Sequence, residues 1–377
     1  MVPCGPARRG CGLPCQVPST GCAGSTLAGR RNRQSLLAGA PNRCDGRHRQ
    51  NGWLPGRFVV AFAKPAAVAG RRVSTSIDKA LCCIVVHFQS PATLSATLAA
   101  LHAASVLGTS TVVVDNSVSD EASESARTIA ERAGCLFLRV DNRGYAAAAN
   151  SGLHFLTSRG LRTELVLLST HESLPEPDAV EKLVEAFRSD PAIAVAGPLL
   201  FNSETVDSKI WSGGGRLSSV LKRPRHHTGR LNDKGEPVDR AWLDGAFTLY
   251  ETAVLEQQRL DESYFLYFEE TDLHVRLARL GRRVVIVPGA HASQSSNGIP
   301  PRLLGRNLFL FQVKLFSPWR GRLAVSFEVG RSLVRKLLTR RGRWGDAASI
   351  VSGWLEGERT IRTGAYSEAS APASRAR

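Results

Sequence analysis

Between residues 81 and 198, apolar segments of strand length alternate with segments of helical pattern, and this alternation restricts the fold more than any other feature. The apolar segments lack the polar residue at every second position that a strand with one face in water would show. Strands buried on both faces and separated by helices pair in parallel. We therefore predict an α/β fold with a mostly parallel, Rossmann-like sheet. The predicted strands cover residues 81–88, 110–116, 135–142, 164–170 and 192–198.

The first 78 residues differ in composition from the rest of the chain. Residues 1–72 contain twelve basic residues and one acid, so they carry +11 of the chain's net charge of +16. Their high content of Gly, Pro, Arg and Ser is typical of disorder. A disordered basic tail would give such a segment, and so would a translation start placed too far upstream. We predict that residues 79–300 form the main folded domain and 301–377 a helical C-terminal extension with a disordered end.

Cysteine usage argues against a disulfide framework. Five of the eight cysteines lie within residues 1–44, at spacings that match no metal-binding pattern. Cys82, Cys83 and Cys135 each lie in an apolar run, where a buried free thiol is the usual state. These features favour a reducing compartment, and we expect a cytoplasmic protein.

Three segments after Pro301 have an amphipathic helical pattern, at residues 302–316, 320–341 and 347–358. Two interpretations are open. The helices form a packed cap, or they form a membrane-surface face, peripheral to the inner side of the plasma membrane, in which apolar residues lie among basic ones. The residues of that face would be Leu308, Phe309, Phe311, Phe316 and Trp319, with Arg306, Lys314 and Arg320.

Polar residues follow four of the predicted strands where the strands end. In an open parallel sheet, ligands bind beyond the carboxyl ends of the strands. Carboxylates and amides at this edge suit ribose hydroxyls and the edge of a base, although each residue alone is more often a turn former. The sequence has no glycine-rich loop typical of P-loop or dinucleotide-binding enzymes. The strand-end residues are His87, then Asp115 and Asn116, then Asp141 and Asn142, then Ser169, Thr170, His171 and Glu172.

Three carboxylates crowd the start of the segment "YFEETDLHVRLARLG", residues 267–281. Leucines at positions 273, 277 and 280 predict a helix with one apolar face. Acids in a first helical turn favour the helix dipole, which is one explanation for Glu269, Glu270 and Asp272. Acids this close also raise one another's pKa, and a carboxylate of raised pKa behind aromatic residues suits a general base. The pattern alone leaves both explanations open.

Several motifs together resemble the family 2 glycosyltransferases, especially the rhamnosyltransferase-like branch. The resemblance covers roughly residues 80–314. It includes "VVVDNSVSD" (residues 112–120), "NRGYAAAANSGL" (142–153), "WLDGAFTLYE" (242–251) and, as the longest and most specific match, "LDESYFLYFEETDLHVRLARLGRRVVIVPGA" (260–290). The resemblance implies the A-type glycosyltransferase fold, inversion at the anomeric carbon and a nucleotide-sugar donor.

The resemblance also assigns roles to residues of this sequence. It favours catalysis at the acidic helix, with Glu270 as the base and Glu269 and Asp272 beside it. Donor-binding residues would be His87, Asp115, Asn116, Asn142, Gly144 and Asn150. Acceptor-side residues would be Trp242, Asp244 and Gly245.

The metal motif of the family is altered here. In "STHESLPEP" (residues 169–177), Glu172 stands where the family usually has an Asp that holds a divalent cation, and His171 lies beside it. Glu172 offers oxygen ligands to Mg²⁺ or Mn²⁺, and His171 suits Mn²⁺ better than Mg²⁺. Members of the family often have a further metal ligand, a His, after the last strand. Gln294 lies near that position in this sequence, and His291 lies three residues before it. A solvated loop that holds no metal is the alternative interpretation.

We predict an inverting glycosyltransferase that moves a sugar from a nucleotide-diphosphate donor to a glycan or lipid-linked acceptor in cell-envelope polysaccharide synthesis. Three alternatives are open. Paired carboxylates also occur in glycoside hydrolases, but adjacent residues do not readily flank one bond from opposite faces. An impaired relative would keep the fold while the metal motif decays. The basic tail prompts a nucleic-acid-binding hypothesis, although such arms bind polyanions without specificity, so we expect no specific nucleic acid.

Overall fold

The structure is a computed structural model that describes residues 81–202, 210–229, 231, 235–295, 298–339 and 344–364. The predicted basic tail, residues 1–78, and the end of the predicted C-terminal extension, residues 365–377, lie outside the described residues. Within the described part of the chain, no helix combines the length and the apolar character needed to cross a membrane.

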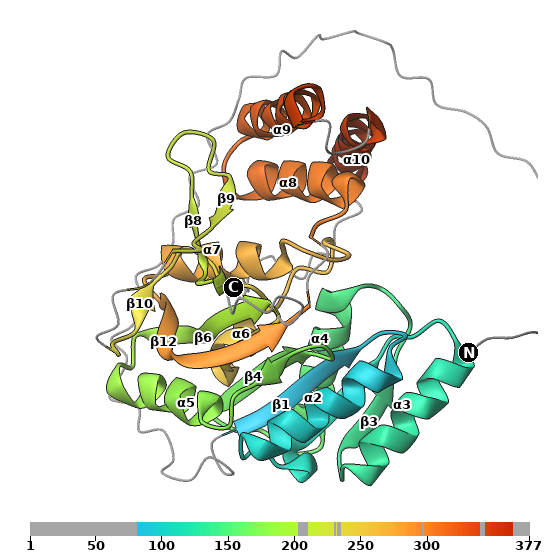
Figure 1. Cartoon of the computed structure of the whole chain (residues 1–377), viewed down its shortest axis with the longest axis vertical. Helices are drawn as coiled ribbons and strands as arrows, with labels where there is room; N and C mark the ends of the chain where they lie inside the picture. Colours follow the sequence, from blue (N-terminus) through green and yellow to red (C-terminus); the bar gives the residue numbers. More distant parts are fainter. Residues whose placement is uncertain are drawn as a thin grey trace, which may run out of the picture. The chain divides into compact units, whose positions relative to one another are not determined.

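A ten-stranded sheet forms the centre of the described chain (Figure 1). Its main path has the order β10-β12-β6-β11-β4-β1-β2-β3, with β5 paired to β12 and β7 to β6. Strands β3, β2, β1 and β4 pair in parallel, as do β6 and β12, while β11 runs antiparallel between β4 and β6. The predicted α/β class with a mostly parallel sheet is therefore confirmed. The strand bounds are β1 Leu81–His87, β2 Thr111–Asp115, β3 Leu136–Arg139, β4 Leu165–Thr170, β5 Leu174–Pro175, β6 Ile193–Asn202, β7 Ile210–Ser212, β10 Val238–Asp239, β11 Phe247–Glu251 and β12 Arg283–Gln294.

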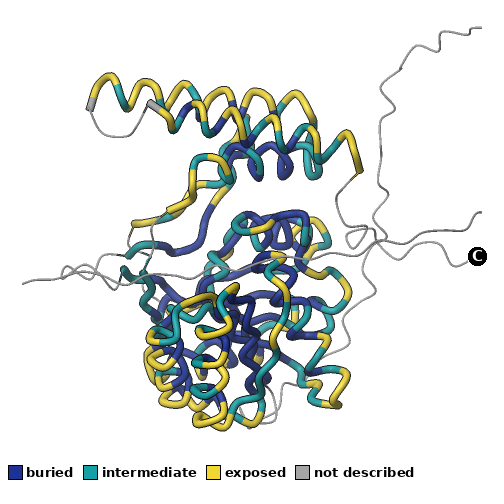
Figure 2. Tube along the Cα trace, turned by 90° about the vertical axis from the view of Figure 1, so that its right-hand side faces the viewer, coloured by how far each residue is buried: buried dark blue, intermediate teal, exposed yellow. Residues whose placement is uncertain are grey.

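Helices cover both faces of this sheet. Successive residues of a strand point to opposite faces, and in β1 Cys83 packs in the core beneath α2, α3 and α5, whereas Ile84 packs in the core beneath α4, α6 and α7. Every residue of β1 is buried, as the unbroken apolar run predicted. Buried segments of the trace lie inside the fold, and exposed segments lie on its outside (Figure 2). The helix bounds are α2 Pro91–Ala103, α3 Asp120–Arg132, α4 Tyr145–Ser158, α5 Ala179–Ser189, α6 Thr252–Gln258 and α7 Glu269–Arg279.

Strand β12 is longer than the sequence pattern predicts. The apolar run suggests a strand that ends at Ala290, but β12 continues to Gln294. The added residues pair with the end of β6 and, at Ala292 and Ser293, with the short strand β5. This extension carries Gln294 and Ser295 to the carboxyl edge of the sheet, beside the loop that follows β4.

The chain after Pro300 forms three helices, α8 Pro301–Leu315, α9 Pro318–Thr339 and α10 Trp344–Thr363. Helices α8 and α10 cross at close range, because a Cβ at Gly305 would lie 2.0 Å from the Ile350 carbonyl oxygen and one at Gly353 would lie 1.9 Å from the Arg302 carbonyl oxygen. Only glycine permits this approach. A two-stranded hairpin, β8 Gly215–Leu217 and β9 Pro224–His226, projects from the sheet towards α9 (Figure 1).

The predicted membrane-surface face on α8 is wrong in its central residues. Leu308, Phe309 and Phe311 are buried, and they form a third core with Tyr264 and Phe268 from the segment before α7. Two of the basic residues of that proposed face also have acidic partners, since Arg306 pairs with Glu356 and Lys314 with Asp261. Helix α8 is therefore a packed cap on α7. Of the proposed apolar residues, Trp319 on α9 is the one that is 52% exposed.

Candidate active site

A strained turn positions the start of α7. Tyr267 and Phe268 both have positive φ angles, 70° and 76°, a conformation that is uncommon for residues other than glycine. The Asn307 side chain on α8 donates hydrogen bonds to the Leu266 and Tyr267 carbonyl oxygens at 2.8 and 2.9 Å. A buried amide from the cap therefore holds the turn, and the first α7 carboxylates follow it directly. Strain maintained in this way is frequent at functional sites.

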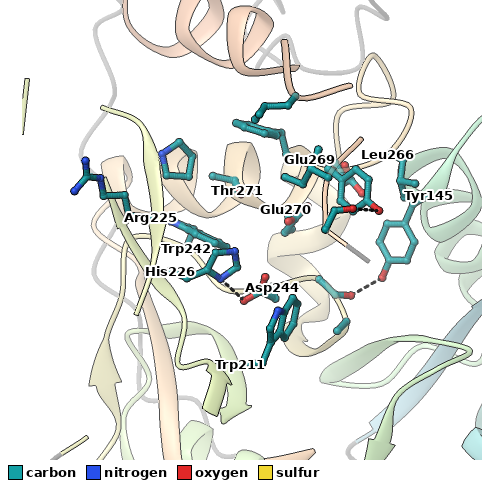
Figure 3. Close-up of a pocket in the computed structure, with 18 of the residues that line it drawn as sticks. Tyr145, Trp211, Arg225, His226, Trp242, Asp244, Leu266, Glu269, Glu270 and Thr271 are labelled. Atoms are coloured by element: carbon teal, nitrogen blue, oxygen red, sulfur yellow. Dashed lines mark hydrogen bonds and ion pairs between the residues drawn. The ribbon is translucent and has the colours of Figure 1, made fainter. Parts of the chain in front are cut away.

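These carboxylates open onto a cavity of about 810 Å³ (Figure 3). Its lower wall comes from the sheet edge and α7, and its outer wall comes from the β8–β9 hairpin, α8 and α9. The cavity has the size of a small-molecule site. Its polar and charged lining includes Tyr145, Thr170, Glu172, Arg223, Arg225, His226, Asp244, Glu269, Glu270, Gln294, Glu328 and Arg331.

Burial raises the pKa of both acids at the start of α7. Glu269 is 3% exposed and its Oε2 has no hydrogen-bond partner, and desolvation raises its pKa to about 7. Desolvation, then the charges of Glu269 and Asp244, raise the pKa of Glu270 well above its ordinary value. Glu270 is partly exposed to the cavity. The pair therefore holds one proton more readily than two separate carboxylates would, as expected for a group that accepts protons near neutral pH.

Asp272, the third predicted acid, has a different environment. It does not line the cavity. Its Oδ2 accepts a hydrogen bond from Arg276 Nε at 2.7 Å, and Tyr264 Oη donates to its Oδ1 at 3.3 Å. Arg276 in turn donates to the Gln258 and Arg259 carbonyl oxygens. Asp272 thus anchors the loop after α6 to α7, and this geometry favours a structural role.

The predicted acceptor-side residues all line the cavity. Asp244 accepts a hydrogen bond from Ser212 and lies 3.6 Å from His226 Nδ1. The Trp242 and His226 rings meet edge to face at 4.8 Å, and Trp211 lies 5.7 Å from His226 (Figure 3). Gly245 contributes its carbonyl oxygen, which accepts from Tyr145 Oη at 2.9 Å. Aromatic faces beside carboxylates suit the apolar face and hydroxyls of a sugar ring.

Two of the predicted donor residues form a buried pair at the ends of β1 and β2. His87 Nδ1 lies 2.8 Å from Asp115 Oδ1, and His87 Nε2 accepts from the Ser90 amide. Since Nε2 is the acceptor, the ring proton lies on Nδ1 and is donated to Asp115. Burial would raise the pKa of Asp115, but hydrogen bonds from His87, Ser117 and Ser123 outweigh it and lower the pKa to about 2. Asp115 is therefore ionised at neutral pH.

Free acceptor oxygens remain at this edge. Asp115 Oδ2 and Asn116 Oδ1 are buried and have no hydrogen-bond partner. Asn116 Nδ2 donates to Asn142 Oδ1 at 3.4 Å, which fixes the amide so that its oxygen is the free atom. Buried acceptors without donors are rare unless a ligand completes them. Ribose hydroxyls and base N–H groups are donors of the kind that these two atoms lack.

The remaining two predicted donor residues serve the acidic loop. Gly144 has φ 96°, and a Cβ there would lie 1.9 Å from the Phe265 carbonyl oxygen, which also accepts from the Tyr145 amide at 3.0 Å. The Asn150 side chain donates to the Leu260 carbonyl oxygen and accepts from the Leu260 amide. The motif "NRGYAAAANSGL" therefore holds residues 260–265 against α4. The family resemblance assigns the motif to binding of the sugar donor and does not predict this contact.

The predicted metal residues lie together at the end of β4. His171 Nε2 lies 3.7 Å from Glu172 Oε1, and desolvation, then the neighbouring His87, lower the pKa of His171, so its ring is neutral at pH 7 and able to bind a metal. Gln294 lines the cavity, and its buried Oε1 has no partner. His291 instead contacts Glu176 and the Pro288 carbonyl oxygen.

This ligand set is small, but it fits a hard cation. Within the described residues, no group of three or more His, Cys, Asp or Glu side chains could hold a metal ion. Mg²⁺, however, is commonly bound by one or two carboxylates, with substrate phosphates and water completing its shell. Glu172 suits that mode of binding, whereas the imidazole of His171 favours Mn²⁺ over Mg²⁺.

Several cavity residues were not predicted from the sequence. Tyr145 lay within a recognised motif but without an assigned role. Trp211, His226 and the arginines of β9 and α9 lie in segments that read as loops or as amphipathic helix. No local pattern indicates that these segments approach α7, because the contact depends on how the hairpin and the cap fold over the sheet.

Comparison with known proteins gives three findings. Residues 79–347 match the profile of the family described as glycosyltransferase-like family 2. N-acetylglucosaminyl-diphospho-decaprenol L-rhamnosyltransferase from two strains of Mycobacterium tuberculosis is 25% identical over 204 residues, which are 44% of this chain and 66% of that protein. The chain thus spans slightly less than two thirds of the length of these curated relatives.

Solved structures of two proteins are similar as well. The mannosyltransferase PcManGT from Pyrobaculum calidifontis, in complex with GDP-Man and Mn²⁺, is 15% identical with a TM-score of 0.47 over 78% of this chain and 90% of that chain. TarS residues 1–349 from S. aureus is 12% identical with a TM-score of 0.46 over 76% of this chain and 92% of that chain. These scores are too low to transfer any property to this chain.

Proposed function

This chain belongs to glycosyltransferase-like family 2, and on that premise we propose that it transfers a sugar from a nucleotide-diphosphate donor to a hydroxyl of an acceptor sugar, with inversion at the anomeric carbon. The predicted family is thereby confirmed, and so is the prediction that the chain is a glycosyltransferase. The observation that carries the proposal is the pair Glu269 and Glu270, which has raised pKa values and opens onto the cavity beside the sheet edge.

The donor would lie along the carboxyl ends of β2, β1 and β4. Asp115 pairs in register with His87, and Val86 with Thr170, so two strand spacings, roughly 10 Å, separate Asp115 from the cavity edge at Thr170. The nucleoside would satisfy Asp115 Oδ2 and Asn116 Oδ1, and the diphosphate would extend towards Glu172. The sugar would then enter the cavity, with Tyr145 and Gly245 between the two halves of the site.

The acceptor hydroxyl would be activated by Glu270. Its carboxylate takes the proton as the hydroxyl oxygen forms a bond to the anomeric carbon from the face opposite the diphosphate. The bond between that carbon and the diphosphate oxygen breaks, and its electron pair leaves with the nucleoside diphosphate. Glu269 supports this step because its negative charge raises the proton affinity of Glu270.

A divalent cation would be held by Glu172 and His171. When bound, it would neutralise charge on the departing diphosphate. Glu270 on α7 would take the proton, and the aromatic wall formed by Trp211, Trp242 and His226 would orient the acceptor. These roles do not depend on the cation.

The acceptor we propose is a glycan or lipid-linked sugar of cell-envelope polysaccharide synthesis. The 25% identical relative carries a name that describes transfer of rhamnose to a sugar linked through a diphosphate to decaprenol. The aromatic wall formed by Trp211, Trp242 and His226 is suited to one or two sugar rings.

A screen of nucleotide sugars with the full chain tests this function. Incubation with a sugar acceptor should release a nucleoside diphosphate in a 1:1 ratio to a new glycoside, and proton NMR should give the anomeric configuration opposite to that of the donor. A product of the same configuration would exclude inversion. Release of free sugar from a glycoside, without any nucleotide, would favour the hydrolase alternative.

A further inference from the structure

Three arginines gather at the outer rim of the cavity, away from the sheet edge. Arg225 lies on β9, Arg223 directly precedes that strand, Arg331 lies on α9, and all three line the cavity. The carboxylate among them is that of Glu328, which pairs with Arg223 and with Arg331 at 2.7 Å. The rim therefore carries three positive charges against one negative charge. Glu269 and Glu270 of α7 lie across the same cavity from Arg225 (Figure 3).

Arg223 is built into this rim rather than lying on the surface. Its side chain is 10% exposed, its guanidinium lies 4.3 Å from the Phe327 ring, and its Nε is buried without a hydrogen-bond partner. Desolvation, then the charges of Arg331 and Arg225, lower its pKa to about 10. A buried guanidinium with an unused donor and two like-charged neighbours is electrostatically incomplete, and an anion would complete it.

The surface beyond the arginines is apolar. Phe327 and Ile299 line the cavity and are 44% and 37% exposed. From Phe327 an apolar stripe continues along α9, because residues four, seven and eleven positions apart share one helix face. The stripe consists of Leu323, Phe327, Val334 and Leu338, which are 50%, 44%, 52% and 79% exposed.

We propose that Arg223, Arg225 and Arg331 bind the diphosphate of a lipid-linked acceptor, whose hydrocarbon chain lies along the apolar stripe of α9. This inference rests on the proposed function and specifies its acceptor. The order of groups across the cavity matches that ligand: carboxylates reach the reacting hydroxyl, aromatic rings hold the sugar, arginines hold the diphosphate, and apolar side chains meet the lipid. Bidentate guanidinium contacts suit a diphosphate better than they suit a neutral glycan.

A calorimetric titration of the full chain with farnesyl diphosphate tests the site. The lipid is kept below the concentration at which it forms micelles. Arg225→Ala and Arg331→Ala are suitable variants because both side chains are exposed, so their loss should leave the fold intact. Each should weaken binding about tenfold, the effect expected from one hydrogen bond to a charged group. The matched control is Arg322→Ala, an exposed arginine on the same helix that does not line the cavity, and it should bind as the wild type does.

Two comparisons identify the ligand. Farnesyl diphosphate should bind more tightly than inorganic pyrophosphate if the apolar stripe contributes. The nucleoside diphosphate that binds best among UDP, GDP and dTDP should bind equally well to the wild type and to both variants. Equal binding of farnesyl diphosphate by wild type and variants would overturn the proposal. A matching loss of nucleoside diphosphate binding would also overturn it, since the arginines would then belong to the donor site.

Failure of this inference can be told apart from failure of the proposed function. Glu270→Gln should bind farnesyl diphosphate normally even when transfer is lost. If Glu270→Gln kept its transferase activity while the arginine variants lost binding, the assignment of the base would be wrong and the diphosphate site would stand.

Discussion

Two acidic regions lie on either side of the candidate active site. A buried carboxyl group has a lowered pKa in one region and a raised pKa in the other. At the sheet edge, Asp115 is fully buried, but hydrogen bonds from His87, Ser117 and Ser123 lower its pKa to about 2. At the start of α7, Glu269 is nearly as buried, yet its neighbour is another acid, and burial raises its pKa to about 7. Donors around a carboxylate, rather than burial alone, decide whether it stays charged.

This difference separates the two roles. An ionised, fixed carboxylate with one free oxygen is suited to accept hydrogen bonds from a ligand that binds and leaves unchanged. A carboxylate that gains and loses a proton near neutral pH is suited to take one from a reacting hydroxyl. Variants in each region can test whether the sheet edge binds the nucleotide and the start of α7 takes the proton.

The largest effect is expected from Glu270→Gln. Loss of the base should reduce kcat about 1,000-fold, within the range that general base catalysis contributes. Binding of the nucleoside diphosphate, measured by calorimetry, should change little, because the donor edge is untouched. The control is Glu124→Gln, whose side chain is 73% exposed on α3. A variant that kept most of its kcat would remove the contrast between the two regions.

The next effect concerns stability. Asp272→Asn should lower the free energy of unfolding by about 3 kcal/mol, because Arg276 would lose its charged partner in a largely buried ion pair. Denaturant unfolding followed by circular dichroism measures this. At temperatures where the variant is folded, its kcat should stay within a few-fold of the wild type. A loss of kcat as large as that of Glu270→Gln, in a stably folded variant, would instead place Asp272 in the chemistry.

Asp115→Asn should act on donor binding. An amide cannot keep both the His87 contact and a charged acceptor oxygen, so the Kd for the nucleoside diphosphate should rise about tenfold. The value of kcat at saturating donor should fall much less. Asp120→Asn, five residues further along and with a side chain that is 90% exposed, is the matched control. An unchanged Kd would mean that the free oxygen at this edge does not contact the nucleotide.

The last prediction concerns a pH dependence of stability. The pKa of Glu269 is about 7 in the folded state and about 4.3 in an unfolded chain. A raised pKa contributes stability that is complete below the unfolded value and is lost as the pH rises through the folded value. The Tm of the wild type should therefore fall relative to that of Glu269→Gln between about pH 4 and 7.

Glu124→Gln should show no such relative change, because Glu124 is exposed. Parallel Tm curves for the wild type and Glu269→Gln would show that Glu269 titrates as an ordinary carboxylate. The raised proton affinity assigned to the α7 pair would then lack support.

The fold could be predicted from local pattern to a large extent. The unbroken apolar runs at β1, β2, β4 and β6 each gave a strand, because a strand covered on both faces needs apolar residues at every position. The length of β12 could not be predicted in this way. Its last residues are polar, and pairing with β6 and β5 keeps them extended.

The site was predictable where its residues follow strands or open a helix. Asp115, Asn116, Glu269 and Glu270 lie at such positions. Gly144 and Asn150 belong to a recognisable motif, but the motif does not say that they hold the acidic loop. Their partners lie more than a hundred residues away in the sequence. Only packing of that loop on α4 gives the motif this function.

Hydrophobic periodicity indicated most of the long strands of the sheet, and residue types that neighbour one another in the chain indicated the positions of the acids. Which acids are charged, and which surfaces meet across the cavity, depends on contacts between distant parts of the chain. A pKa depends on the donors and charges that folding brings within a few ångströms. The arginine rim on β9 and α9, more than a hundred residues apart, exists only because the cap folds over the hairpin.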